Sequence, residues 1–208
     1  MTSRARAWQL LRLCALVVAL AACSQSVVVQ ADFPEPVVSP LPLVVGLKYP
    51  EALTGYVYTE EVPNDYAWTF DIGAANTSLF DSVFLNLFER TVRIDPASGS
   101  PAPADVDAVI EPSLEAFEFS LPRQSRTNQY AVWIRYNLTV FSRDGEVIVS
   151  WPVSAYGQSD SRAFKANRSM ELATIRAMRD AAATIALGFE KQAKIRDALL
   201  KESANEES

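Results

Sequence analysis

The sequence contains few of the side chains on which most enzymatic chemistry depends. Its 208 residues contain no histidine and only two cysteines, Cys14 and Cys23, both near the amino terminus. Histidine is the usual partner of a catalytic serine or cysteine and a common metal ligand, so these paired nucleophiles and imidazole sites are excluded. A thiolate zinc site or a disulfide framework in the body of the protein is excluded too. We therefore expect no cofactor and no metal.

Carboxylates remain as candidates for catalysis. Glu111 and Glu115 share one face of a predicted strand in plain alternation, and we interpret them as a solvated strand face rather than a catalytic pair. Glu60, Glu61 and Asp65 lack the oxygen-ligand spacing of a calcium loop. An enzyme that uses carboxylates is therefore the least favoured hypothesis, and we expect the protein not to be an enzyme.

Three large side chains are candidates for binding a partner. Trp133 and Arg135 lie on the polar face of a predicted strand, and Trp68 lies in a short aromatic strand. Tryptophan and arginine are enriched among the residues that dominate interface energies. A helix covering the polar face would instead make Trp133 a core residue, so both interpretations stay open. A nucleic-acid partner is not expected, because the formal charge is −6.

The amino terminus has the layout of a secretory signal. Residues 1–22 carry three arginines, no acid, and an apolar stretch from Leu13 to Leu20. That stretch is too short for a membrane span, which needs roughly 20 apolar residues. The sequence Leu20-Ala21-Ala22-Cys23 follows it. An ordinary signal cleaved at Ala19-Leu20-Ala21 is the alternative.

The motif ending at Cys23 resembles the lipobox of bacterial lipoproteins. That resemblance implies a signal peptide over 1–22, diacylglycerol on the Cys23 thiol and an acylated amino terminus. Ser24 stands where an aspartate would favour the inner membrane, so the resemblance implies an outer-membrane location. Two or three acyl chains hold a protein firmly, since each buried methylene contributes about 0.8 kcal/mol. The mature 186 residues would carry 16 basic and 25 acidic side chains, a formal charge of −9.

Residues 23–42 are predicted to form the acylated cysteine and a proline-rich tether. Four prolines between positions 34 and 42 favour an extended segment, which would hold the domain tens of ångströms from the bilayer at about 3.1 Å per residue. A strand over Val27–Val29 is the alternative. A single periplasmic domain over 43–200 and a disordered tail over 201–208 complete the predicted organisation.

Hydrophobic periodicity predicts the elements of this domain. Ser78, with Asp81 three residues later, predicts a helix start. The expected order is a strand over 43–49, a hairpin of 56–59 with 66–70, a helix from Ser78 to Phe88, a strand over 106–121 with a bend near Ala116, a hairpin of 130–141 with 147–155 through Asp144-Gly145, and a helix over 161–200. The expected fold class is α+β, with a mostly antiparallel sheet and two helices packed on one face.

This order of elements after a lipobox is similar to the lipopolysaccharide-assembly lipoproteins and to other small envelope lipoproteins with two helices on one sheet. The leading hypothesis is a lipid-anchored, non-catalytic accessory that binds another envelope protein on the periplasmic side of the outer membrane. Outer-membrane protein, lipopolysaccharide or surface-polymer machinery would suit such a role. The alternative is a lipid or glycolipid carrier with an apolar groove between sheet and helices.

Overall fold

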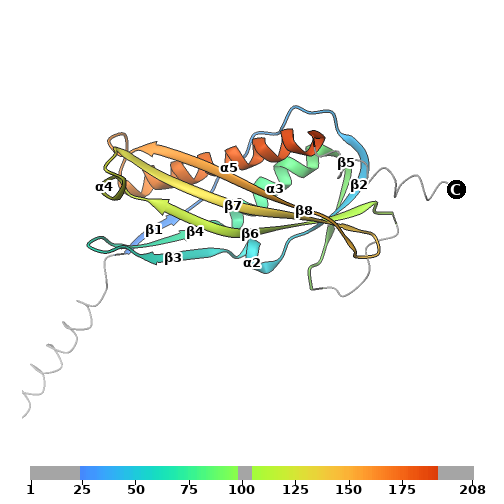
Figure 1. Ribbon diagram of the computed structural model, residues 1–208, viewed down its shortest axis with the longest axis horizontal. Helices are drawn as coiled ribbons and strands as arrows, with labels where there is room; N and C mark the ends of the chain where they lie inside the picture. Colours follow the sequence, from blue (N-terminus) through green and yellow to red (C-terminus); the bar gives the residue numbers. More distant parts are fainter. Residues whose placement is uncertain (1–23, 98–104, 192–208) are drawn as a thin grey trace, which may run out of the picture.

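The computed structural model describes residues 24–97 and 105–191 (Figure 1). The leader, Cys23, the end of the last helix predicted to residue 200, and the predicted tail lie outside these residues. The described elements follow in the order β1 (Ser24–Val28), β2 (Leu41–Lys48), α2 (Glu51–Thr54), β3 (Val57–Glu61), β4 (Ala67–Asp71), α3 (Gly73–Leu87), β5 (Phe88–Ile94), β6 (Ala108–Ser120), α4 (Pro122–Ser125), β7 (Gln129–Ser142), β8 (Val147–Asp160) and α5 (Ala166–Lys191).

The strands form two mixed sheets. The larger has the order β5-β2-β6-β7-β8, and the smaller has the order β1-β4-β3. β2 pairs in parallel with β5 and β6, and β1 pairs in parallel with β4, whereas the β3–β4, β6–β7 and β7–β8 pairs are antiparallel. The predicted combination of sheet and helices is therefore confirmed, but the described strands form two mixed sheets rather than one mostly antiparallel sheet. Parallel pairs need long crossovers, and the one from β2 to β5 passes through α2, β3, β4 and α3.

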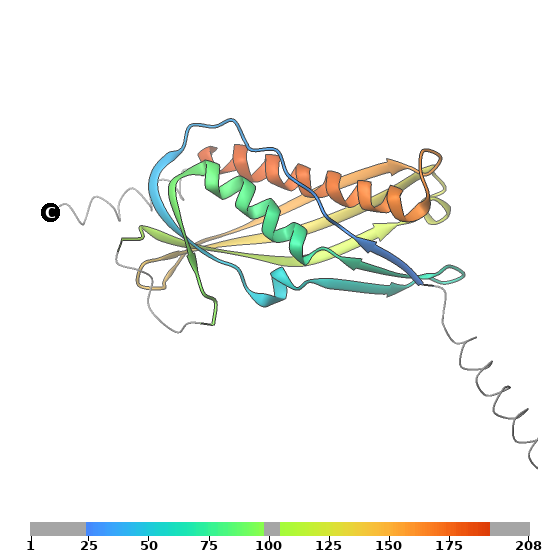
Figure 2. The same ribbon diagram turned by 180° about the vertical axis from the view of Figure 1, so that it is seen from behind.

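Two long helices, α3 and α5, lie on one face of the larger sheet, as predicted (Figure 2). Tyr136 of β7 meets Phe80 of α3 with ring centroids 5.2 Å apart, and Trp151 of β8 meets Phe189 of α5 at 6.0 Å. Tyr136 also donates a hydrogen bond of 2.7 Å to the amide oxygen of buried Asn76 in α3. Aromatic rings of the sheet and of both helices thus pack against each other in this layer.

The long β6–β7–β8 meander has the predicted bend and turn. The pairing jumps from Leu114 opposite Tyr136 to Ala116 opposite Arg135, so Glu115 is an extra, bulged residue. Beyond the bulge, Phe117 and Phe119 face the smaller sheet and pack on Phe70, with centroids 4.8 and 5.0 Å away. Gly145 has φ of +86° in the β7–β8 turn, a conformation that glycine adopts without strain.

The prediction of a free tether over 23–42 is wrong within the described residues. Ser24–Val28 form strand β1 along β4, and the side chains of Val27, Val29 and Phe33 are buried. The following segment crosses the helix layer (Figure 2). There the Ser78 hydroxyl donates to the carbonyl of Ala31 at 3.1 Å. The consecutive β-branched residues Val27, Val28 and Val29 favour an extended strand here. Cys23 is therefore followed directly by the folded domain.

Both long helices begin away from their predicted first residues. α3 starts at Gly73, with Ile72 as its N-cap residue and no side-chain cap. Ser78 therefore lies inside the helix, where its hydroxyl contacts the amino-terminal segment rather than capping. α5 starts at Ala166 rather than at 161, because a turn over Ser161–Phe164 follows β8.

Candidate functional site

Trp68 lies in the core and is not available to a partner. It is 2% exposed and packs against Phe70, Phe119 and Tyr130 with ring centroids 6.0 to 6.3 Å away. The prediction that it binds a partner is therefore wrong, because β6 and β7 of the larger sheet pack over its face of β4. Its indole Nε1 is buried and has no hydrogen-bond partner among the described residues.

Trp133 and Arg135 lie together on the open face of the larger sheet, opposite the helices. Trp133 is 43% exposed and stands directly across the β7–β8 ladder from Tyr156, which is 41% exposed. Their ring centroids are 5.1 Å apart at an interplanar angle of 44°. These three residues form what we call the Trp133 patch.

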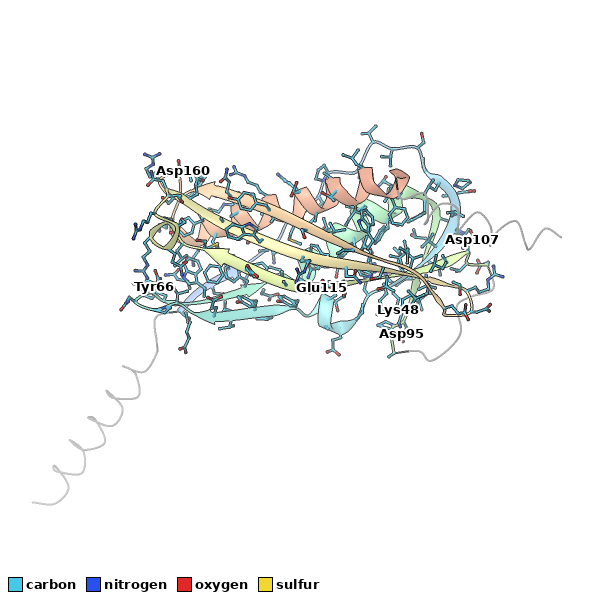
Figure 3. The ribbon with its side chains drawn as sticks, in the orientation of Figure 1. Lys48, Tyr66, Asp95, Asp107, Glu115 and Asp160 are labelled. Atoms are coloured by element: carbon cyan, nitrogen blue, oxygen red, sulfur yellow. The ribbon has the colours of Figure 1, made fainter. Side chains whose placement is uncertain are left out.

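The side chains of the Trp133 patch make polar contacts with neighbouring residues of the same sheet. Arg135 Nε lies 3.2 Å from the carboxylate of Glu115, the bulged residue near the middle of the sheet (Figure 3). The Tyr156 hydroxyl donates to Gln158 at 3.1 Å. A depression of about 280 Å³ beside the patch is lined by Ala116, Glu118, Trp133, Ile134, Arg135, Ser154 and Ala155. The patch thus offers two aromatic faces and a guanidinium in a shallow hollow with a carboxylate beside it.

Tyr156 is the member of the patch that sequence reasoning missed. A signal was present, because Ser154, Tyr156 and Gln158 alternate with the buried residues of β8. The β7–β8 turn and a one-residue register shift between Val140 and Phe141 together set the register that brings Tyr156 opposite Trp133.

The free edge of β8 is closed by α5. The backbone N–H of Tyr156 donates to the carboxylate of Asp180 at 3.0 Å, and Arg176 donates to the carbonyl of Gln158. These side chains occupy groups that an added strand would need. Near Tyr156 the face of the sheet is therefore more open to a partner than its edge.

Four of the acidic side chains singled out from the sequence, Glu60, Asp65, Glu111 and Glu115, have local partners. Glu111 pairs with Lys48 at 2.8 Å and Glu115 with Arg135, while Asp65 pairs with Arg123. Glu60 accepts a 2.6 Å hydrogen bond from Tyr58, which together with partial burial raises the pKa of Tyr58 to about 12. Within residues 24–97 and 105–191, no group of three or more acidic residues, histidines or cysteines is placed to hold a metal ion.

A second pocket opens where β1, β4 and the start of α5 meet. Its volume is about 400 Å³, and its lining includes Tyr66, Trp68, Leu121, Arg123 and Tyr130. In the middle of the molecule, by contrast, rings of α3, α5 and the sheet are in contact.

No described helix is both long and apolar enough to cross a membrane.

Comparisons with known proteins identify the fold alone. No family model and no curated protein matches the sequence. The structure is similar to protein XCC0632 from Xanthomonas campestris, of family DUF330, with a TM-score of 0.50 and 12% identity over 77% of this chain and 92% of that chain.

Two more distant likenesses have TM-scores below 0.5. A lipoprotein candidate from Caulobacter crescentus CB15 scores 0.36, with 14% identity over 61% of this chain and 79% of that chain. A candidate neuraminyllactose-binding hemagglutinin homolog from Helicobacter pylori scores 0.42, with 12% identity over 86% of this chain and 100% of that chain. Neither is close enough to support an argument about function.

Proposed function

We propose that the protein is a bacterial lipoprotein, anchored through acylated Cys23 on the periplasmic side of the outer membrane, and that it acts as a non-catalytic accessory. In this role it binds another envelope protein through the Trp133 patch. The anchor rests on the lipobox motif. The binding role rests on the exposed aromatic pair beside Arg135 on an open sheet face.

A purely structural role would give the aromatic pair only a modest contribution to stability and would leave much of its apolar area uncovered. A cross-strand aromatic pair stabilises a sheet by roughly 0.2–1 kcal/mol. Keeping two large rings more than 40% exposed leaves apolar area in water that a partner could cover, at about 25 cal/mol per Å². Tryptophan, tyrosine and arginine are also the residue types found most often at the energetic centre of interfaces. The patch therefore suits a protein surface with an apolar residue beside a carboxylate.

The carrier alternative has less support. It needs an apolar groove between sheet and helices, and the described rings of Phe80, Phe84, Tyr136 and Phe189 are in contact there.

Photo-crosslinking in intact cells tests the binding role. A photoreactive phenylalanine analogue replaces Trp133, and a control variant carries it at exposed Leu187 of α5, on the helix side of the molecule. We expect position 133 to give a discrete adduct with one envelope protein and position 187 not to give it. The purified partner is then titrated with the wild type and with Trp133→Ala. The variant should bind at least about 30-fold more weakly, as expected for a hot-spot residue. Identical adducts from both positions, or unchanged affinity, would contradict the proposal.

A further inference from the structure

One end of the molecule combines the start of β1 with three connections between elements. These are the β3–β4 turn (62–66), the β6–β7 connection (121–128) and the β8–α5 connection (161–165). Arg123 pairs with Asp65 of the first, Ser161 N–H donates to Asn128 at 2.8 Å, and Asn167 donates to the carbonyl of Ser26 at 3.1 Å. We call this surface the anchor-side end. Figure 3 shows Tyr66 and Asp160 at this end and Asp107 at the other.

The three connections at the anchor-side end carry an excess of cations, flanked by the acids Glu61 and Asp160 at the ends of β3 and β8, in a protein that is acidic as a whole. Its three connections contain four cations, Arg123, Arg126, Arg162 and Lys165, and a single carboxylate, Asp65. Asp65 pairs with Arg123, and Asp160, the last residue of β8, pairs with Arg162. Arg126 and Lys165 are exposed and have no ion pair among the described residues.

Two exposed aromatic side chains accompany these cations. Phe164 is 53% exposed in the β8–α5 connection, and Tyr66 is 47% exposed in the β3–β4 turn. Aromatic residues at the headgroup level and cations near lipid phosphates are both favourable at a membrane interface.

Because Ser24 already belongs to strand β1, the attachment point at Cys23 lies next to the anchor-side end. Cys23 is bonded to Ser24, and Ser24 pairs with Ala67 at the start of β4. One residue spans at most about 3.8 Å, so an acyl group on Cys23 would hold the anchor-side end against the headgroups rather than tens of ångströms away. The basic and aromatic surface and the attachment point thus coincide.

We infer that the anchor-side end is a second membrane contact, in which Phe164 and Tyr66 enter the interface and Arg126 and Lys165 bind the phosphates of anionic phospholipids. This inference rests on the proposed lipid anchor. The contact fixes the orientation of the domain, whose β7 strand of 14 residues then extends roughly 46 Å along the long axis. It also offsets the repulsion expected between an acidic protein and anionic lipid.

A fluorescent probe on the acylated mature protein tests the inference. Its thiol at Cys23 is blocked by lipid and Cys14 is removed with the leader, so Ala163→Cys introduces the one thiol that an environment-sensitive dye can label. Asp144→Cys in the β7–β8 turn, at the opposite end, is the matched control. The proteins are reconstituted in vesicles of phosphatidylcholine alone or mixed with phosphatidylglycerol. We expect the dye at position 163 to shift to the blue in the mixed vesicles, and the dye at position 144 to keep its aqueous spectrum.

Charge variants separate docking from anchoring. Arg126→Gln with Lys165→Gln should weaken docking of the labelled end roughly 30-fold, since each cation near an anionic surface contributes about 1 kcal/mol, and high salt should do the same. Phe164→Ser should weaken it roughly tenfold. Arg90→Gln, which removes a cation far from this end, should change nothing. Protein that fails to float with vesicles would refute the anchor itself. Protein that floats but gives the same dye spectrum in both lipids, or is indifferent to the charge variants, would overturn this inference alone.

Discussion

The backbone of helix α5 lies directly against Gly157 of β8, and Gly157→Ala should destabilise the protein strongly. A β-carbon at this position would lie 2.1 Å from the carbonyl oxygen of Ala173 and 2.3 Å from the backbone nitrogen of Ala177. An ordinary carbon–oxygen contact is about 3.3 Å, so α5 would have to move away by about 1.2 Å. Both contacts are backbone atoms, and no side-chain rotation can relieve them.

The cost follows from what α5 buries. Met170, Ala173, Ala177, Met178, Ala181 and Ile185 are completely buried. A gap of 0.5–1 Å already removes about a quarter to a half of the dispersion attraction of each contact. We expect a loss of about 2–3 kcal/mol in the free energy of unfolding, the range for an overfilled core.

Urea denaturation measures this loss. With a slope of about 2 kcal/mol per molar urea, the midpoint should fall by roughly 1–1.5 M while the slope stays constant. Gly55→Ala is the matched control, because its β-carbon would meet only the Glu51 carbonyl, at 3.3 Å, and its φ is −108°. The control should stay within about 0.5 kcal/mol of the wild type. If Gly157→Ala unfolds at the same urea midpoint as the wild type, the close packing of α5 on β8 is refuted.

Three further outcomes follow from the structure. Trp68→Ala should lower the free energy of unfolding by about 3–5 kcal/mol, whereas Trp133→Ala should lower it by no more than about 1 kcal/mol. Equal losses for the two variants in urea denaturation would contradict the placement of Trp68 in the core and Trp133 on the surface. Tyr136→Phe should cost about 1–3 kcal/mol by the same assay, because the buried amide oxygen of Asn76 loses its donor; an unchanged stability would deny that hydrogen bond. The raised pKa of Tyr58 means that its contribution to stability is complete below about pH 10 and is lost as pH rises through about 12. Glu60→Gln should lower that pKa in a phenolate absorbance titration, with Tyr58→Phe identifying the signal, and no change would reject the Tyr58–Glu60 contact.

Sequence patterns of neighbouring residues predicted much of the larger sheet. Alternation over 130–141 and the Asp144-Gly145 turn gave the β7–β8 hairpin, and the change of apolar parity in 106–121 gave the bulge at Glu115. The same alternation placed Trp133 and Arg135 on the polar face, where they are exposed. Such features are local, because side-chain period and turn chemistry are properties of neighbouring residues.

Pairings between distant segments could not be predicted in the same way. β1 is polar at Ser24, Gln25 and Ser26, and it becomes a strand only because β4, about 40 residues later, offers an edge. The parallel pairing of β2 with β5 and β6 likewise depends on crossovers and not on the composition of β2. The burial of Trp68 did have a local signal, since Trp68 and Phe70 alternate with Thr69 and Asp71, but the rings that cover it come from β6 and β7.

Intact mass spectrometry of the protein purified from bacterial membranes tests the proposed attachment to the membrane most directly. We predict a mature chain that begins at Cys23 and carries the added mass of diacylglycerol and an amide-linked acyl chain. A chain that retains residues 1–22, is cut after Ala21, or carries a free thiol at Cys23 would contradict the lipid anchor and the membrane contact built on it.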